Sequence, residues 1–340
     1  MSKQPSIILA PLHGYTEAAF RNALAECFEG YDESIAPFIS LAPAERINPR
    51  RLHDLNPAKN TRLKVIPQIL GNESRLFINM ANALAELDYD RINLNMGCPK
   101  KAIATKQRGS GLLPHPELIY NLLSEIIPNI SQRLSVKLRL GRNHPDEVYP
   151  VIDVLNQFPL EAVTIHPRIG IDLYEVKADV DRFETAVHLF KHPVIYNGDI
   201  FSLSDFQRIS QRFPSITSFM IGRGVFANPF IAEQIKGLQL PSADEQRNRF
   251  IHFIAVLMEE LNNDSKSPHF LFCRMKDYWG FFSYLFEDSE KLYQKLVRIQ
   301  DEATFFQAQD KILNKAHWKD LNTSHTTFSG TKADKKELDG

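Results

Sequence analysis

The chain has 340 residues, 43% of them hydrophobic, and a formal net charge of −1 at pH 7. This length and composition exclude a fibre or a disordered chain, and they leave room for one large globular domain and a smaller one. Because the charge is balanced, any nucleic-acid partner would have to meet a local basic face of the protein.

Along the first 240 residues, short apolar runs alternate with amphipathic segments at a spacing typical of repeated β-α units. Eight apolar runs predict strands at 7–10, 36–41, 64–70, 91–96, 135–140, 162–166, 194–197 and 219–222. Helical patterns lie between them at 17–28, 73–87, 116–127, 146–158, 182–190 and 203–213. The strands are almost continuously apolar, so we expect an α/β fold, a closed TIM (β/α)8 barrel covered by helices. A doubly wound open sheet is the alternative, but no Gly-x-Gly-x-x-Gly follows the first strand.

Polar residues gather where the expected strands end, which is where barrels of this kind carry their chemistry. Lys137 is the most informative, because an unpaired ammonium inside an apolar strand is costly and must meet an anion or a polar ligand. A structural ion pair is the alternative for this lysine. The seventh and eighth strands end in Asn197-Gly198-Asp199 and Gly222-Arg223-Gly224. An ordinary turn would explain the first of these segments, but side by side the two are typical of a phosphate-binding cup.

Segment 93–100 places Cys98 on a tight turn directly after a strand. Gly97 permits the turn and Pro99 stiffens its exit, while Lys100 supplies positive charge that favours a thiolate or an anionic substrate. A buried structural cysteine is the alternative reading. The other cysteines, Cys27 and Cys273, are interpreted as structural.

Three widely spaced cysteines fit neither a disulfide framework nor a zinc site, so we expect a reducing, cytoplasmic location and no bound metal. The first apolar run is too short for a signal peptide, and no run approaches the roughly 20 residues of a membrane helix. A soluble, unprocessed protein with no membrane partner is the resulting expectation.

After Pro241 the alternation stops, and helical patterns at 245–262, 268–286 and 290–313 predict a separate helical domain. We therefore expect a barrel domain over 1–239, a helical domain over 240–318 and a disordered tail over 319–340. Arg274 and Lys276 lie two residues apart on the middle helix and cannot fully share one face. One of them is expected to contact phosphate while the other pairs within the domain; the aromatic residues around them are interpreted as packing.

These segments resemble the tRNA-dihydrouridine synthases in their order and spacing, from about residue 6 through the helical domain, and the layout is most similar to the DusC type. The resemblance implies an FMN-containing barrel that reduces the C5–C6 double bond of a uridine in tRNA, with NADPH as the reductant. It also implies that the helical domain is a second RNA-binding surface and that the target base is swung out into the pocket. The matching motifs are Ala10-Pro11-Leu12, Gln68, segment 93–100, Lys137-Leu-Arg139, segment 165–168, Asn197-Gly198-Asp199 and Gly222-Arg223-Gly224.

Carried over by position, Cys98 is implied to be the general acid that protonates uracil C5. The implied FMN-binding residues are Pro11, Leu12, Gln68, Lys137, His166, Asn197, Gly198, Asp199, Gly222 and Arg223. The implied substrate-binding residues are Asn95, Lys100, Arg139, Arg274 and Lys276. One departure from the family pattern is the loop that carries Tyr174, which lacks the usual glycine close behind the tyrosine.

Two other functions remain open at this stage. An FMN barrel could act on ribosomal RNA or on a free pyrimidine or other small molecule, and the helical domain argues against a small substrate. An RNA-binding module without catalysis is the second alternative, and the presence of Cys98, Lys137 and His166 argues against it.

Overall fold

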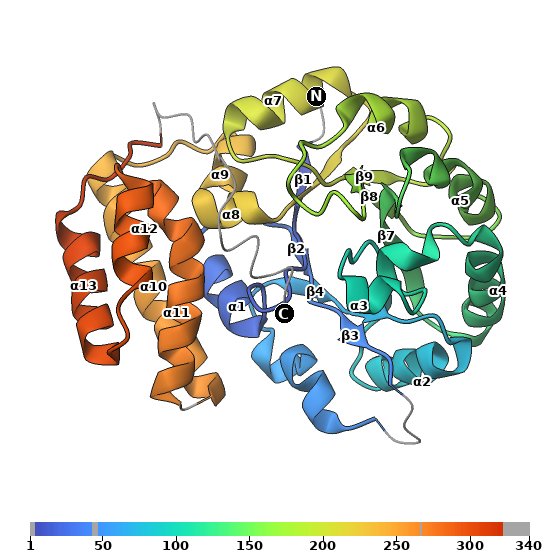
Figure 1. Cartoon of the computed structure of the whole chain (residues 1–340), viewed down its shortest axis with the longest axis horizontal. Coiled ribbons are helices and arrows are strands. Elements are labelled where there is room, and N and C mark those ends of the chain that lie inside the picture. Colours follow the sequence, from blue (N-terminus) through green and yellow to red (C-terminus); the bar gives the residue numbers. More distant parts are fainter. Residues whose placement is uncertain (1–3, 43–46, 266, 322–340) are drawn as a thin grey trace.

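The computed structural model describes residues 4–42, 47–265 and 267–321. A barrel of parallel strands surrounded by helices lies beside a bundle of helices formed by the C-terminal part of the chain (Figure 1). This arrangement confirms the expected α/β TIM barrel with a C-terminal all-helical region. None of the helices within the described residues is long and apolar enough to cross a membrane.

All strand pairs of the barrel are parallel, and the sheet closes on itself. Strand β1 pairs with β10 on one side and β2 on the other, β2 pairs with β4, and β5 pairs with β6. Strands β4 and β5 are two halves of one extended segment interrupted at Pro67, so the circuit is complete. The strands are β1 (Ser6–Leu9), β2 (Glu33–Ile35), β3 (Ile39–Ser40), β4 (Lys64–Ile66), β5 (Gln68–Leu70), β6 (Arg91–Met96), β7 (Arg133–Gly141), β8 (Val163–Ile169), β9 (Val194–Tyr196) and β10 (Ser218–Ile221).

The second barrel strand differs from its prediction over 36–41. It consists of β2 and β3, and residues 36–38 between them, which include Pro37, are not in a strand. Proline has no N–H to donate to a ladder, so the pairing breaks there and starts three residues earlier than the apolar pattern indicated.

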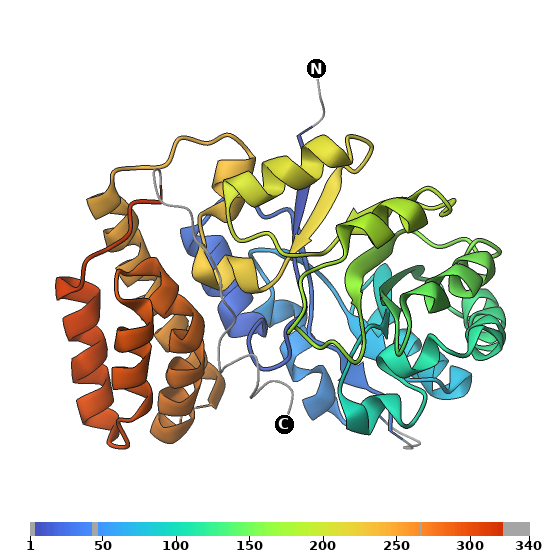
Figure 2. The same cartoon turned by 45° about the horizontal axis from the view of Figure 1, so that its top comes forward.

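Helices cover the outside of the barrel (Figure 2). Between β3 and β4 the described residues, 41–42 and 47–63, form two 3-10 turns, Pro49–Leu55 and Pro57–Lys59, and no α-helix. The barrel helices are α1 (Ala18–Cys27), α2 (Ser74–Ala85), α4 (Pro116–Ile126), α5 (Val148–Leu155), α6 (Val180–Val187) and α7 (Leu203–Arg212), with the short helices α3 (Lys101–Ala104), α8 (Arg223–Ala227) and α9 (Ile231–Ile235).

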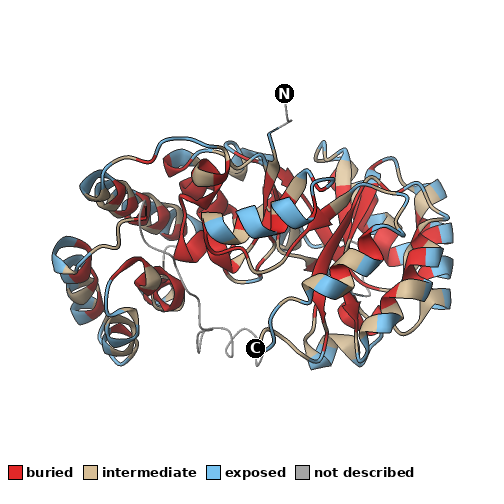
Figure 3. Ribbon diagram, turned by 90° about the horizontal axis from the view of Figure 1, so that it is seen from above, coloured by how far each residue is buried: buried red, intermediate tan, exposed pale blue. Residues whose placement is uncertain are grey.

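Alternation along the strands separates two environments. On β1, Ile7 and Leu9 belong to the main core between sheet and helices. Ile8 of β1 and Ala10 just after it belong to a separate small cluster with residues of β2, β4, β9 and β10. Successive side chains of a strand point to opposite faces, so this small cluster fills part of the barrel interior. The strands are buried on both faces, as the red ribbons of Figure 3 show.

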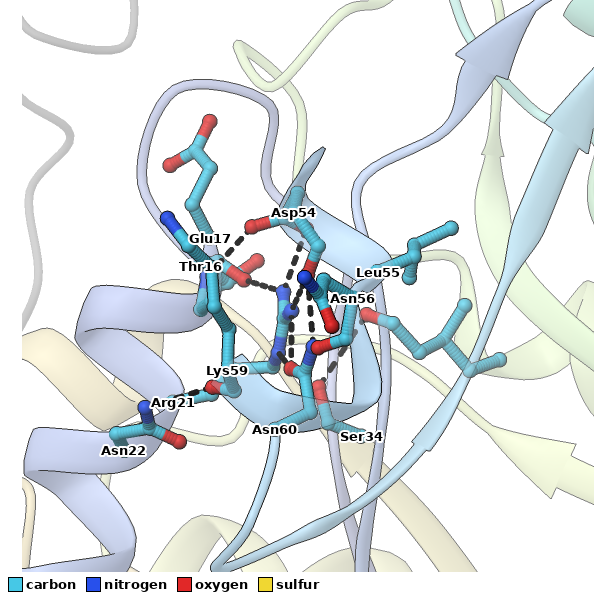
Figure 4. A network of polar contacts seen from close by, with 12 residues as sticks. Thr16, Glu17, Arg21, Asn22, Ser34, Asp54, Leu55, Asn56, Lys59 and Asn60 are labelled. Atoms are coloured by element: carbon cyan, nitrogen blue, oxygen red, sulfur yellow. Dashed lines mark hydrogen bonds and ion pairs between the residues drawn. The ribbon is translucent and has the colours of Figure 1, made fainter. Parts of the chain in front are cut away.

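A buried arginine fastens the 3-10 turns to α1. Arg21 is 1% exposed and donates through Nη1 to the Thr16 carbonyl (2.7 Å) and to Asp54 Oδ2 (3.0 Å). Its Nη2 donates to Asn60 Oδ1 (2.7 Å) and to the Asp54 carbonyl (2.9 Å), as Figure 4 shows. Because its donors are paired in this way, the guanidinium stabilises the two 3-10 turns against α1.

The C-terminal bundle consists of α10 (Ala243–Ser265), α11 (Pro268–Phe282), α12 (Ser289–Val297) and α13 (Glu302–Lys315). The single helix predicted over 290–313 is wrong, because α12 ends at Val297 and Asp301 caps a new helix by accepting from the Thr304 N–H (2.7 Å). Most of the predicted tail over 319–340 lies outside the described residues, which end at 321.

The bundle packs tightly on the barrel. The ring of Phe20 on α1 lies 5.8 Å from Phe253 of α10 and 5.6 Å from Tyr278 of α11. The Tyr278 hydroxyl donates to the Tyr15 carbonyl (2.7 Å), and an Arg274 guanidinium nitrogen donates to the Gly14 carbonyl. Helix α11 therefore holds the loop that follows β1.

Candidate active site

Two adjoining cavities lie at the carboxyl ends of the barrel strands. The first, of about 420 Å³ including space open to solvent, is lined by the loops after β1, β9 and β10. The second, of about 600 Å³ on the same measure, is lined by the loops after β1, β2 and β6. Pro11, Lys137, His166 and Tyr174 line both cavities, so the two form one continuous site.

A polar network supports the cysteine turn from below. Asn95 Oδ1 accepts from the N–H groups of Gly97 (3.0 Å) and Cys98 (2.9 Å), and its Nδ2 donates to Gln68 Oε1 (2.8 Å). Gln68 Nε2 donates in turn to Asn93 Oδ1 (2.7 Å). Alternation along β6 turns both asparagines inward, so the network fixes where the Cys98 side chain enters the second cavity.

The segment after the cysteine completes the turn. The Ser110 N–H and hydroxyl both donate to the Cys98 carbonyl, at 3.0 and 2.9 Å. Gly109 has φ +57°, and a Cβ placed on it would lie 2.8 Å from the same carbonyl oxygen. Only glycine fits this position without displacing the cysteine.

Strand β7 brings two cations to the centre of the site. Lys137 lies beside Asn95 in the β6–β7 register, and Arg139 lies beside His166 in the β7–β8 register. Burial, together with the neighbouring Arg139, lowers the pKa of Lys137 to about 7, although the Cys98 thiolate acts in the opposite direction. The Arg139 Nη1 donates to the carbonyls of Ile169 and Leu173, each at 2.8 Å.

A chain of contacts links three further residues at the ends of β8, β9 and β10. Arg168 Nη1 lies 2.8 Å from His166 Nε2, and Arg168 Nη2 lies 2.6 Å from Asp199 Oδ2. Arg223 Nη2 lies 3.1 Å from the other carboxylate oxygen, Asp199 Oδ1. Burial and then Arg139 and Arg168 hold the pKa of His166 well below its usual value, so the imidazole is neutral. Burial alone would raise the pKa of Asp199, but the attraction and hydrogen bond of Arg168 lower it overall.

Tyr174 reaches into the site from the loop after β8. Its ring centroid lies 4.3 Å from the Arg223 guanidinium carbon, 5.3 Å from that of Arg139 and 5.7 Å from the His166 ring. The predicted set of site residues contains neither Tyr174 nor Arg168. Arg168 could have been predicted as a site residue, because it follows His166 by two residues on one strand and therefore lies on the same face.

Most of the predicted site residues are brought together. Gln68, by contrast, is fully buried beneath the cysteine turn and lines neither cavity. The first cavity is lined by Pro11, Leu12, Lys137, His166, Asn197, Gly198, Asp199, Gly222 and Arg223, and the second by Asn95, Cys98, Lys100 and Arg139. His13, Phe38 and Phe201 line the site without having been predicted.

Arg274 and Lys276 lie on α11, outside the lining of both cavities. Arg274 pairs with Glu17 (3.4 Å) in addition to its bond to Gly14. Lys276 Nζ donates to the Ile299 carbonyl (2.7 Å) at the end of α12, so its ammonium group serves the bundle.

The chemistry of the first cavity fits a flavin mononucleotide. Arg223 and Arg168 outnumber the single carboxylate of Asp199, which leaves positive charge for a phosphate. Pro11 and Leu12 provide an apolar wall for a ring, and Lys137 lies where the first cavity joins the second. The residues present would therefore hold the phosphate and ring of such a group.

A parallel barrel with a cysteine, a lysine and a cluster of arginines at its carboxyl ends defines a barrel enzyme. The chain belongs to the dihydrouridine synthase family: the family described as "Dihydrouridine synthase (Dus)" matches residues 8–317. The recognition from the sequence motifs and the predicted class, an oxidoreductase of this family, are thereby confirmed. Membership also supports the predicted flavin cofactor.

Individual relatives agree with this placement. The chain is 26% identical over 304 residues to a tRNA-dihydrouridine(16) synthase of Cupriavidus necator, covering 87% of this chain and 93% of that protein. It is also 26% identical to the tRNA-dihydrouridine synthase B of Pseudomonas putida, over 74% of this chain and 76% of the relative. The chain is thus equally identical to relatives of two different types, so its assignment to the DusC type stays a prediction.

A similar fold is found in histamine dehydrogenase from Rhizobium sp. 4-9, with a TM-score of 0.51 and 14% identity. The match covers 76% of this chain and about half, 49%, of the dehydrogenase.

Proposed function

We propose that this chain is a tRNA-dihydrouridine synthase that binds FMN in the first cavity and reduces a uridine of tRNA held in the second, with NADPH as the reductant. The observation that carries the proposal is the continuity of the two cavities through Lys137 and His166, with Cys98 on the wall of the second. A cofactor and a base can then lie next to each other between the cysteine and the cation cluster. Because its substrate is tRNA, we place the enzyme in the cytoplasm.

In this reaction a bound flavin supplies hydride to C6 of the uracil ring. Cys98 then donates its thiol proton to C5, which completes the addition across the double bond. The Cys98 side chain suits this role because the Asn95 and Ser110 contacts fix the turn, and because the residue is only 8% exposed. The thiolate left behind is stabilised by Lys137 and Arg139 until it regains a proton.

Lys137 has a second task in the proposal. Its pKa of about 7 is set mainly by burial, and the neighbouring Arg139 lowers it further. An anionic group bound beside it would restore the full ammonium charge, so the lysine favours the cofactor and stabilises negative charge that develops on it. His166 and Arg223 complete the cofactor-binding group, together with Asn197, Gly198, Asp199 and Gly222.

RNA binding by the helical domain, residues 240–318, is also part of the proposal. Arg274 lies on α11 next to the loop that lines both cavities, and Lys100 is one of the residues that line the second cavity. A folded RNA that contacts both positions would have a single base swung into the pocket.

The test is to purify the protein, record its visible spectrum and incubate it with NADPH and tRNA that lacks dihydrouridine. We expect a flavin spectrum and dihydrouridine in the product. The Cys98→Ala variant should keep the flavin spectrum and lose at least about 99% of turnover, because it removes the proton donor alone. A fully active variant would contradict the role of the cysteine.

Parallel reactions with ribosomal RNA and with free uridine separate the alternatives. Product in either of these and none in tRNA would replace the substrate in the proposal. A protein that binds no flavin would overturn the proposal as a whole.

A further inference from the structure

The contact between Arg168 and His166 has only one possible hydrogen-bonding pattern. A guanidinium group carries donors and no acceptor, so His166 Nε2, 2.8 Å from Arg168 Nη1, must accept. A neutral imidazole that accepts at Nε2 carries its proton on Nδ1. The contact is deep in the protein, since His166 is 7% and Arg168 4% exposed.

Arg168 is itself held in place. Its Nη2 pairs with Asp199 Oδ2 (2.6 Å), and its Nε donates to the Val176 carbonyl (2.5 Å). The other oxygen of Asp199 is engaged by Arg223, and the Ala178 N–H donates to Oδ2 (3.0 Å). The guanidinium plane is therefore fixed from three sides and cannot turn away from the imidazole without breaking an ion pair.

We propose that Arg168 is a positioning residue: anchored by Asp199, it fixes His166 as the Nδ1–H tautomer. The imidazole then serves the site as a neutral hydrogen-bond donor and not as an acid or a base. His166 lines both cavities, so the fixed donor acts where cofactor and substrate meet. The catalytic consequence rests on the proposed function, whereas the tautomer is a property of the protein itself.

The surroundings of His166 oppose a second proton on the ring. Lys137 and Arg139 face it from β7, Arg168 from its own strand β8 and Arg223 from the start of α8. Tyr174 packs against the ring from the loop after β8. Burial and these four positive groups all lower the pKa of the imidazole, and Asp199 is already engaged by two arginines.

The experiment is a pH series of 15N–1H spectra of protein labelled with 15N-histidine, from about pH 5.5 to 8.5, with His166→Gln identifying the signal. In the wild type we expect the Nδ1–H pattern alone at every pH. A doubly protonated or Nε2–H pattern of His166 near neutral pH would overturn the proposal.

Arg168→Met should bring a measurable Nε2–H fraction into the His166 signal, and Arg168→Lys should suppress it again by restoring a cationic donor. Arg91→Met is the matched control: it removes an arginine paired with two carboxylates at the opposite end of the barrel and should leave the signal unchanged. An Arg168→Met spectrum identical to the wild type would refute the positioning role.

Kinetics complete the test. Loss of one oriented hydrogen bond predicts a roughly tenfold lower kcat for Arg168→Met with KM for tRNA changed less than about twofold, and recovery in Arg168→Lys. A rise in KM with kcat unchanged would instead assign Arg168 to substrate binding and overturn the proposal. If the spectra agree while the wild type makes no dihydrouridine, the proposed function fails and the tautomer assignment stands.

Discussion

Replacing Lys137 with methionine should stabilise the flavin-free protein while impairing its function. Methionine has a similar length and flexibility, and it removes the ammonium group without leaving a large void. The pKa of this lysine falls from 10.5 to about 7 in the folded protein. Because each tenfold change in a protonation equilibrium is worth about 1.4 kcal/mol, the buried charge costs the folded state about 4 kcal/mol at pH 7.

The sign of the pH dependence follows from the same values. Between pH 7 and 10.5 the unfolded chain binds more protons at this residue than the folded protein does, so wild-type stability rises with pH in that window. The Lys137→Met variant lacks this contribution. Its advantage should therefore be largest at or below about pH 7 and disappear near pH 10.5.

Denaturant unfolding of the flavin-free proteins at several pH values measures the difference directly, and at pH 7 the melting temperature should rise by about 5 °C. Lys64→Met, on an exposed strand position, is the control and should change stability by less than about 0.5 kcal/mol. If Lys137→Met were less stable than the wild type at pH 7, the ammonium group would have a compensating partner in the flavin-free protein and the reasoning would be refuted.

Three further substitutions test the supports of the site. Asn95→Ala should reduce turnover at least about tenfold with flavin retained, since it frees the backbone of the Cys98 turn; dihydrouridine formation at wild-type rate would contradict this. Gly109→Ala should lower activity by a similar factor, measured in the same assay, because its Cβ would press on the cysteine carbonyl. Arg21→Met should lower the free energy of unfolding by about 3–5 kcal/mol, because Asp54 loses the arginine that balances its charge. A loss of less than about 1 kcal/mol, measured by urea titration, would refute that account.

The sequence was sufficient for the barrel because hydrophobic periodicity is a local property. Strands such as β6 and β7 were found with nearly their observed bounds. Cys98 was found from its place just after β6, and Lys137 as a charged residue inside the apolar β7. The split of the second strand around Pro37 was missed, although proline is a known interruption. The start of α13 was also missed, and here the signal was present, since Asp301 three residues before Thr304 is an ordinary helix cap.

Contacts between distant segments could not be read from the sequence. Tyr174 enters the site because its loop folds back over the arginines at the strand ends. The course of this loop cannot be predicted from a periodic pattern in the sequence. Gln68 was assigned to the cofactor because it belongs to a matching motif, whereas its side chain is committed to Asn93 and Asn95. The local sequence pattern identifies which polar side chains point into the barrel. The packing of the folded chain determines which of these side chains reach the cavity.

The anchoring of the β1 loop by α11 has a consequence for the order of synthesis. The carbonyls of Gly14 and Tyr15 are held by Arg274 and Tyr278, which are 260 and 263 residues further along the chain and so leave the ribosome later. The loop that lines both cavities therefore gains these supports only after α11 has been translated. A nascent or truncated chain that ends before α11 lacks these two bonds, so a competent site requires synthesis through α11.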